Sequence, residues 1–283
     1  MSYQDAIISW EPVGSVAPTE LRAARLEAHW AARLVGAVGE AAARDPLADY
    51  GHIALTFAPN GWAMGAVTRD GVRVGVELEA LALGVFGEAG EPRARLELAG
   101  LTLDEARQEL GRLLGTAAPE PSREEIEDHP LATGGRFGAS STAAAAELGR
   151  WFRNGQRFVA AVAAQHLGAS PVRLWPHHLD IATLISLDPP GTPEPRSIGF
   201  GLSPGDPAYA EPYFYTSPWP VTADDDLAPL AGGGHWHREG FVSAILPASA
   251  LGGEAGAQVA TYLESALAAC RKFLAGYGQA TVR

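Results

Sequence analysis

The stretch Asp70-Gly-Val-Arg-Val-Gly-Val-Glu-Leu78 has the clearest secondary-structure pattern in the chain. Asp-Gly is a turn dipeptide suited to hairpins, because glycine tolerates positive φ angles. Apolar side chains at the even-numbered positions from Val72 to Leu78 then alternate with polar or small ones. A period of two residues is typical of a strand that has one face on the core. This stretch therefore predicts an antiparallel sheet in the first part of the chain.

Helices and further strands are expected on both sides of this stretch. Apolar residues at helical spacing predict a long helix from Thr19, whose side chain can cap it, to about Arg44. Apolar and polar residues alternate again at 52–57 and 93–98, which predicts two strands. Thr102-Leu-Asp-Glu105 has the form of a capping box, so a shorter helix is expected to start there.

The order of helix, strands and helix returns in the second part of the chain. Periodicity predicts a long helix, five short strands and a final helix, at about 141–167, 172–175, 178–187, 196–202, 212–217, 239–246 and 256–274. The strands follow one another too closely for helical crossovers, which favours antiparallel meanders.

We therefore predict an α+β fold of two similar halves, each a mostly antiparallel sheet flanked by helices. The N-terminal half is expected over 1–115 and the C-terminal half over 140–283. The segment between them, 116–139, holds three prolines, a Gly134-Gly135 pair and clustered acids. A segment this long without regular structure is typical of a linker or of a cover over a site. The repeated order of elements also suggests an internal duplication.

Composition limits the classes of function. Hydrophobic residues make up 47% of the 283 residues and charged residues 19%, so the chain can bury a substantial core. The formal net charge of −12 argues against a nucleic-acid-binding protein, which needs a basic surface to neutralise phosphates. No apolar run approaches the roughly 20 residues that span a bilayer.

The single cysteine, Cys270, excludes an internal disulfide framework and favours a reducing compartment. The first residues, Met1 to Pro12, lack the basic and apolar regions of a signal peptide. We therefore expect a cytoplasmic protein with no nucleic-acid or membrane partner. The oligomeric state is left open.

Two histidine-rich segments stand out, Trp175-Pro-His-His-Leu-Asp180 and His235-Trp-His237. In a regular strand, alternation places His178 and Asp180 on the same face. It likewise places His235 and His237 together on one face of their own strand. Imidazoles spaced in this way, with a carboxylate, can hold a divalent transition metal. The candidate metal ligands are therefore His178, Asp180, His235 and His237, for an ion such as zinc, manganese or nickel. Histidines that only stabilise loops through hydrogen bonds are the alternative.

Candidate ligand-binding residues surround these segments. In Glu211-Pro-Tyr-Phe-Tyr215, alternation places Tyr213 and Tyr215 on one face of a strand, where their hydroxyls can orient a polar ligand. An aromatic wall that packs on a helix is the alternative. The complete predicted set of ligand-binding residues is His52, Trp175, Asp180, Glu211, Tyr213 and Tyr215.

These motifs resemble an uncharacterised family of bacterial proteins known as a domain of unknown function. The resemblance rests on 170–182, on 210–215 followed by Pro218, on 237–247 and, more weakly, on 52–57, and it extends from about residue 25 to 250. It implies no reaction. It does imply a shared pocket, because family members look similar at the positions of His52, Trp175, Asp180, Glu211 and His237, whereas those of His177 and His178 vary.

Three hypotheses of function follow. The first is a divalent-metal-dependent hydrolase or lyase, in which a remaining carboxylate activates a metal-bound water. The second is a non-catalytic protein that binds a small molecule or a partner in an aromatic slot made by Trp175, Tyr213, Tyr215, Trp219 and Trp236. The third is a structural or oligomerisation role, in which the tryptophan and histidine segments only pack.

Overall fold

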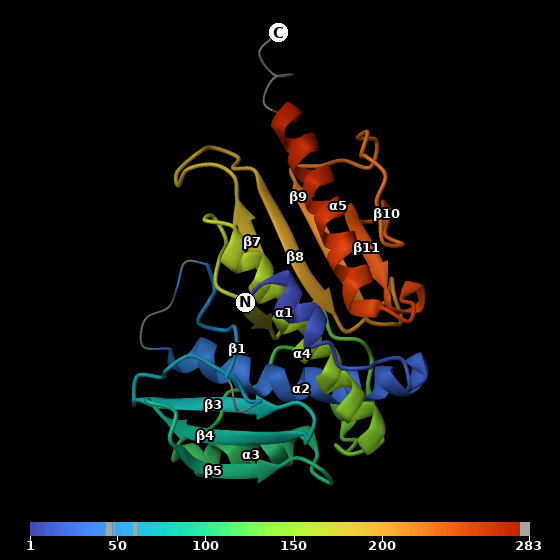
Figure 1. The fold of residues 1–283 in the computed structure, drawn as a ribbon. Helices are drawn as coiled ribbons and strands as arrows, with labels where there is room; N and C mark the ends of the chain where they lie inside the picture. The colour runs from blue at the N-terminus through green and yellow to red at the C-terminus, as the bar shows by residue number, and fades with distance from the viewer. Residues whose placement is uncertain (44–46, 48, 59–60, 278–283) are drawn as a thin grey trace.

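Two antiparallel sheets form the protein in the computed structural model, which describes residues 1–43, 47, 49–58 and 61–277. The predicted helix end at Arg44 lies outside the described residues. The first sheet has five strands in the order β1-β2-β3-β4-β5, and the second has six in the order β10-β11-β9-β8-β7-β6 (Figure 1). The predicted α+β fold with two sheet-containing halves is confirmed.

The first sheet is a meander in which each strand pairs with the next. Its strands are β1 (Thr56–Phe57), β2 (Ala63–Met64), β3 (Val72–Glu77), β4 (Ala82–Gly87) and β5 (Pro92–Glu97). The alternating stretch quoted above forms β3. Strand β4 has no period of two because all six of its residues are buried, as is common in a strand covered on both faces. For that reason the sequence pattern did not predict it.

The helices of the first half are α1 (Tyr3–Ile8), α2 (Pro18–Ala42) and α3 (Leu103–Leu114). Thr19 does not cap α2, because the helix begins one residue earlier, at Pro18, and Ala17 stands at the cap position. Proline favours this first helical position, since its missing N–H would have no partner there. The capping box at Thr102 is present and opens α3 as predicted.

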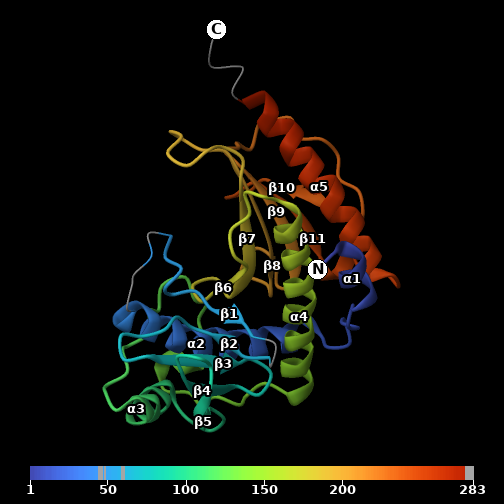
Figure 2. The same ribbon diagram turned by 60° about the vertical axis from the view of Figure 1, so that its left-hand side comes forward.

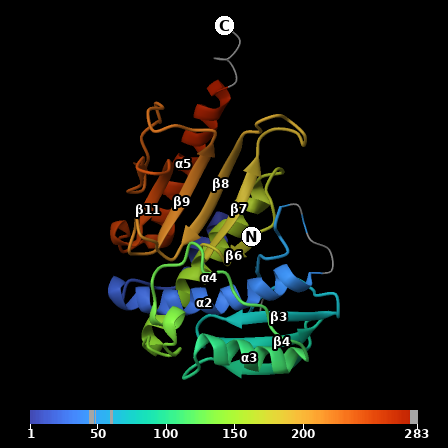
Figure 3. The ribbon, with the colours of Figure 1, turned by 180° about the vertical axis from the view of Figure 1, so that it is seen from behind.

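The second sheet is covered by helices on one face only. Its strands are β6 (Arg173–Trp175), β7 (Asp180–Ser186), β8 (Ser197–Ser203), β9 (Tyr213–Trp219), β10 (His235–His237) and β11 (Ser243–Pro247). Helices α4 (Thr142–Gln165) and α5 (Ala255–Tyr277) pack on this face (Figures 1 and 2). Seen from behind, β7, β8 and β9 lie in front of both helices (Figure 3).

Two buried glutamates join the halves where α2 and α4 pack on each other. Glu27 of α2 accepts backbone hydrogen bonds from residues 138–140, just before α4, at 2.7–3.2 Å. Glu147 of α4 accepts backbone hydrogen bonds from residues 14–16, just before α2, at 2.8–3.1 Å. Each glutamate thus binds the backbone of the segment that leads into the other helix. Within the described residues, no helix is both long and apolar enough to cross a membrane.

Candidate ligand cavity on the second sheet

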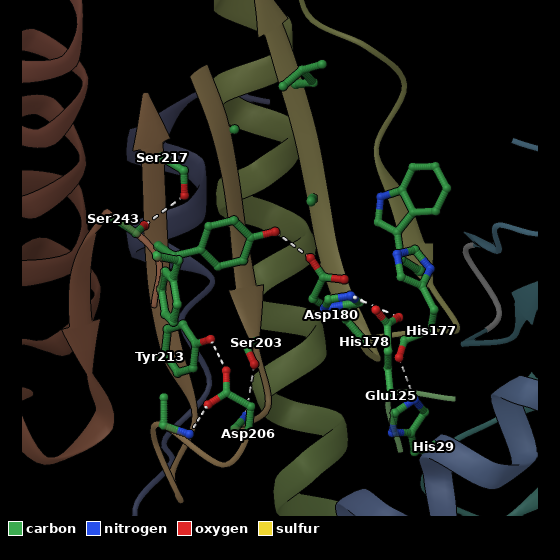
Figure 4. Close-up of a pocket in the computed structure, with 18 of the residues that line it drawn as sticks. His29, Glu125, His177, His178, Asp180, Ser203, Asp206, Tyr213, Ser217 and Ser243 are labelled. Atoms are coloured by element: carbon green, nitrogen blue, oxygen red, sulfur yellow. Dashed lines mark hydrogen bonds and ion pairs between the residues drawn. The ribbon is translucent and has the colours of Figure 1, made fainter. Parts of the chain in front are cut away.

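The two faces of the second sheet differ in their side chains. Strand alternation turns apolar residues such as Ile181, Phe200 and Phe214 toward the helices, where they are fully buried. The open face carries Asp180 and Tyr215, together with glycines and serines. A cavity of about 1240 Å³ lies over this open face. Figure 4 shows Asp180 inside it, with Tyr213 and Asp206 to one side and His178 and Glu125 to the other.

Two glycines of β8 shape the floor of the cavity, Gly199 by lining it and Gly201 by letting a tyrosine ring pass over it. A Cβ atom on Gly201 would lie 2.5 Å from the hydroxyl oxygen of Tyr215, so only glycine lets this ring cross β8. A Cβ atom on Gly199 would meet nothing closer than the backbone oxygen of Ser217, at 3.9 Å. The floor is therefore filled by an aromatic ring at Gly201 and open at Gly199.

Asp180 and Tyr215 form the central polar pair. The tyrosine hydroxyl reaches from β9 across β8 and donates a hydrogen bond to the carboxylate at the start of β7. Burial raises the pKa of Asp180, although the Tyr215 hydrogen bond and the nearby His178 act in the opposite direction. Burial also raises the pKa of the Tyr215 hydroxyl, and the Asp180 charge adds to this. The hydroxyl therefore keeps its proton and remains a donor to the carboxylate.

A second pair of the same kind lies in the turn after β8, Ser203-Pro-Gly-Asp-Pro207. Asp206 accepts backbone hydrogen bonds from Ala208 at 2.8 Å and from Tyr209 at 2.9 Å. Its other carboxylate oxygen accepts a hydrogen bond from the Tyr213 hydroxyl (Figure 4). The turn therefore fixes Asp206 beside Tyr213 at one end of the cavity.

Residues from the first half and from the connecting segment also line the cavity. Helix α2 contributes Arg25 and His29, and the connecting segment contributes residues 125–127. His29 lies 2.9 Å from the carbonyl oxygen of Pro176, to which its Nε2–H donates. Burial is the main cause that lowers the pKa of His29 to about 3 and that of His177 to about 4, so both are neutral at pH 7.

His178 lies in a turn instead of on the predicted strand. Residues 176–179 form this turn, and Leu179 has a φ of 54°. The turn delays the start of β7 to Asp180. His178 is 58% exposed, and its Nε2 lies 3.5 Å from a carboxylate oxygen of Glu125. It does line the cavity, as do Trp175, Asp180, Tyr213 and Tyr215 from the predicted set.

The structure does not bring the four predicted metal ligands together. His235 and His237 lie on β10, and three strands separate them from Asp180 on β7. Four strand spacings correspond to about 19 Å, too far for two side chains to share one ion. The Tyr209 hydroxyl instead lies 2.9 Å from Nε2 of His235 and 3.1 Å from Nδ1 of His237. Among the described residues, no group of three or more His, Cys, Asp or Glu side chains could hold a metal ion.

Two other predicted ligand-binding residues make local contacts away from the cavity lining. The Glu211 carboxylate accepts hydrogen bonds from the backbone N–H of Ser249 at 2.6 Å and from its hydroxyl at 2.7 Å, in the short 3-10 helix after β11. Nδ1 of His52 accepts a hydrogen bond from the backbone N–H of Leu47 at 3.1 Å. The predicted strand at 52–57 is reduced to Thr56–Phe57, so His52 lies in a turn, and its neighbours line the cavity.

Several lining residues were not predicted from the sequence. Asp206 is one of them, and it stabilises the turn after β8 as well as facing the cavity. One signal was available in Ile198-Gly-Phe-Gly-Leu-Ser203, where every second residue is small. Small residues on one face of a strand mark a place where another group approaches closely. Arg25, His29 and Glu125 carry no such local signal.

Comparisons with models of protein families, with curated proteins and with solved structures found no match for this chain. The site is therefore interpreted from its own geometry.

Proposed function

We propose that this protein binds a small organic molecule in the cavity over the second sheet. The observation that carries the proposal is the open face of β7, β8 and β9, where the Asp180–Tyr215 pair and the uncovered backbone of Gly199 line one cavity. Ligand sites are typically concave and mostly apolar, with a few fixed polar groups, and this cavity has that composition. Trp175, Tyr213 and Tyr215 supply its aromatic walls.

This proposal follows the second of the three sequence hypotheses, with a smaller aromatic slot. Trp219 borders an adjoining cavity, and Trp236 donates its indole N–H to the Ala228 carbonyl at 2.8 Å. A metal-dependent reaction would require ligands that the sheet order keeps apart, so we do not propose it.

The test is a thermal-shift screen of a metabolite library against the wild type and Gly199→Phe. The new ring would occupy the open floor, so ligands that stabilise the wild type should lose their effect on the variant. Thr261→Phe, on the exposed face of α5, is the matched control and should respond like the wild type. Ligands that stabilise all three proteins equally, or a screen without any stabilising compound, would contradict the proposal.

A further inference from the structure

We infer that the ligand is an organic amine whose protonated nitrogen binds Asp180 and whose apolar body lies over Gly199 toward Leu184 and Phe241. This inference rests on the proposed function and names the class of ligand. It follows from the charges around the cavity, from the bonding of Asp180 and from the apolar side chains at the other end.

The charged groups that line the cavity are mostly carboxylates. Among the residues that the structure describes, five carboxylate side chains line it, against one guanidinium group: Asp49, Glu125, Glu127, Asp180 and Asp206, against Arg25. Arg25 lies 2.5 Å from Glu127 and also donates to the Gly205 carbonyl, so its charge is already paired. Asp49 pairs with Arg173. An excess of negative charge therefore remains around Asp180, Asp206 and Glu125, and such a field attracts cations.

Asp180 lacks a strong counter-charge. Among the described residues its carboxylate forms no ion pair with lysine or arginine, and Tyr215 supplies its hydrogen bond. Asp180 is half-buried, and a carboxylate that is partly removed from water gains from a partner of opposite charge. A ligand ammonium group would provide both the opposite charge and hydrogen-bond donors. The surrounding aromatic rings favour a cation as well, since the face of an aromatic ring attracts positive charge.

Apolar side chains mark the other end of the cavity. Leu184 and Phe241 line it and are 46% and 41% exposed. An adjoining cavity of about 720 Å³ shares both residues and adds Trp219, which is 60% exposed. Large apolar side chains that cluster on a hollowed surface indicate a binding site.

The distance between the two ends sets the length of the ligand. From Asp180 to Leu184 the strand advances four residues, or about 13 Å. Gly199 pairs with Leu184 across β7 and β8, and because it has no side chain, the floor of the cavity is open there. A ligand with a charged head and an elongated apolar body therefore matches this surface.

The experiment titrates wild-type protein calorimetrically with n-octylammonium, octanol and octanoate at neutral pH. Octylammonium should bind about tenfold more tightly than octanol, as expected for a hydrogen bond to a charged group, and octanoate most weakly. In Asp180→Asn the preference for the amine over the alcohol should disappear. Asp188→Asn is the matched control, because Asp188 pairs with Arg196 outside the cavity, and it should keep the preference.

A second measurement does not depend on the folding of Asp180→Asn. In the wild type, affinity should rise about fourfold for each methylene from butylammonium to octylammonium, because each added group is buried. Gly199→Phe should remove this dependence on length. An affinity that does not change with chain length would overturn the inference that an apolar body lies over Gly199.

The outcomes separate this inference from the proposed function. If octanol or octanoate binds as tightly as octylammonium and Gly199→Phe weakens that binding, the inference of an amine ligand is wrong, but the proposed ligand cavity is supported. If none of the three probes binds, the inference of an amine ligand is also wrong. The metabolite screen alone then decides whether the cavity binds another molecule.

Discussion

Both sheets are antiparallel, but the glycines of their central strands have different surroundings. In the first sheet Gly75 and Gly84 pair across β3 and β4, and a Cβ on Gly84 would lie 2.5 Å from Phe86 and 2.8 Å from Trp62. In the second sheet the Gly199 position is open. Aromatic rings therefore fill one outer face, whereas the other retains a cavity. The same backbone architecture thus becomes a packed sheet or a binding surface according to which side chains cover it.

The largest expected effect on stability comes from removing an aromatic ring from the outer face of the first sheet. Phe86 is 4% exposed and its ring lies 5.1 Å from that of Trp62, between centroids. Phe86→Ala should lower the free energy of unfolding by about 3–5 kcal/mol, measured by urea denaturation, because it leaves a cavity in a packed layer. Phe241→Ala, which truncates an exposed ring just before β11 of the second sheet, should cost less than about 1 kcal/mol. Equal losses would contradict the difference between the sheets.

The next effect concerns His29, on the helix that contacts the cavity of the second sheet. Its pKa in the folded protein is about 3, mainly because of burial, whereas the unfolded chain titrates at the ordinary value of 6.5. The folded state therefore binds fewer protons between these values, and its stability is full above about pH 6.5 and falls as pH is lowered. By about pH 4.5 the loss from this group should reach about 3 kcal/mol.

His29→Gln keeps a donor for the Pro176 carbonyl but cannot titrate. Its unfolding free energy should depend less on pH than that of the wild type, by about 2–3 kcal/mol between about pH 7 and pH 4.5, in urea titrations. An identical pH dependence in both proteins would show that His29 does not carry the effect.

The smallest effect compares single methyl groups on the two sheets. Gly84→Ala should cost about 1–3 kcal/mol, because the new Cβ collides with Phe86 and Trp62. Gly199→Ala should stay within about 0.5 kcal/mol of the wild type, because its Cβ enters open space. Thermal denaturation of the two variants side by side measures the difference. A reversed order would show that the Gly199 floor is not open.

Local patterns predicted much of the fold and part of the candidate site. The alternation after Asp70 predicted β3, and that of Tyr213 and Tyr215 placed both rings on one face, where both line the cavity. The prediction for His178 was less accurate, because a turn at 176–179 interrupts the assumed strand. Strand β4 escaped prediction because burial of both faces removes the periodic signal.

The histidine pair on β10 illustrates a different limit. Their spacing is regular, and alternation describes which side chains share a face of one strand. It does not describe which strands become neighbours, and β10 lies at the edge of the sheet far from Asp180. A metal site shared by both segments was therefore a hypothesis that only the strand order could test.

The sequence by itself determined the four longer helices, most strands and the side chains that point from one strand in one direction, since these depend on contacts between near neighbours in the chain, whereas the short helix α1 was not predicted. Tertiary structure alone decided the order of the strands, the face left without helices and the approach of Arg25, His29 and Glu125 to Asp180. Those features depend on pairing and packing between distant segments, for which local periodicity carries no signal.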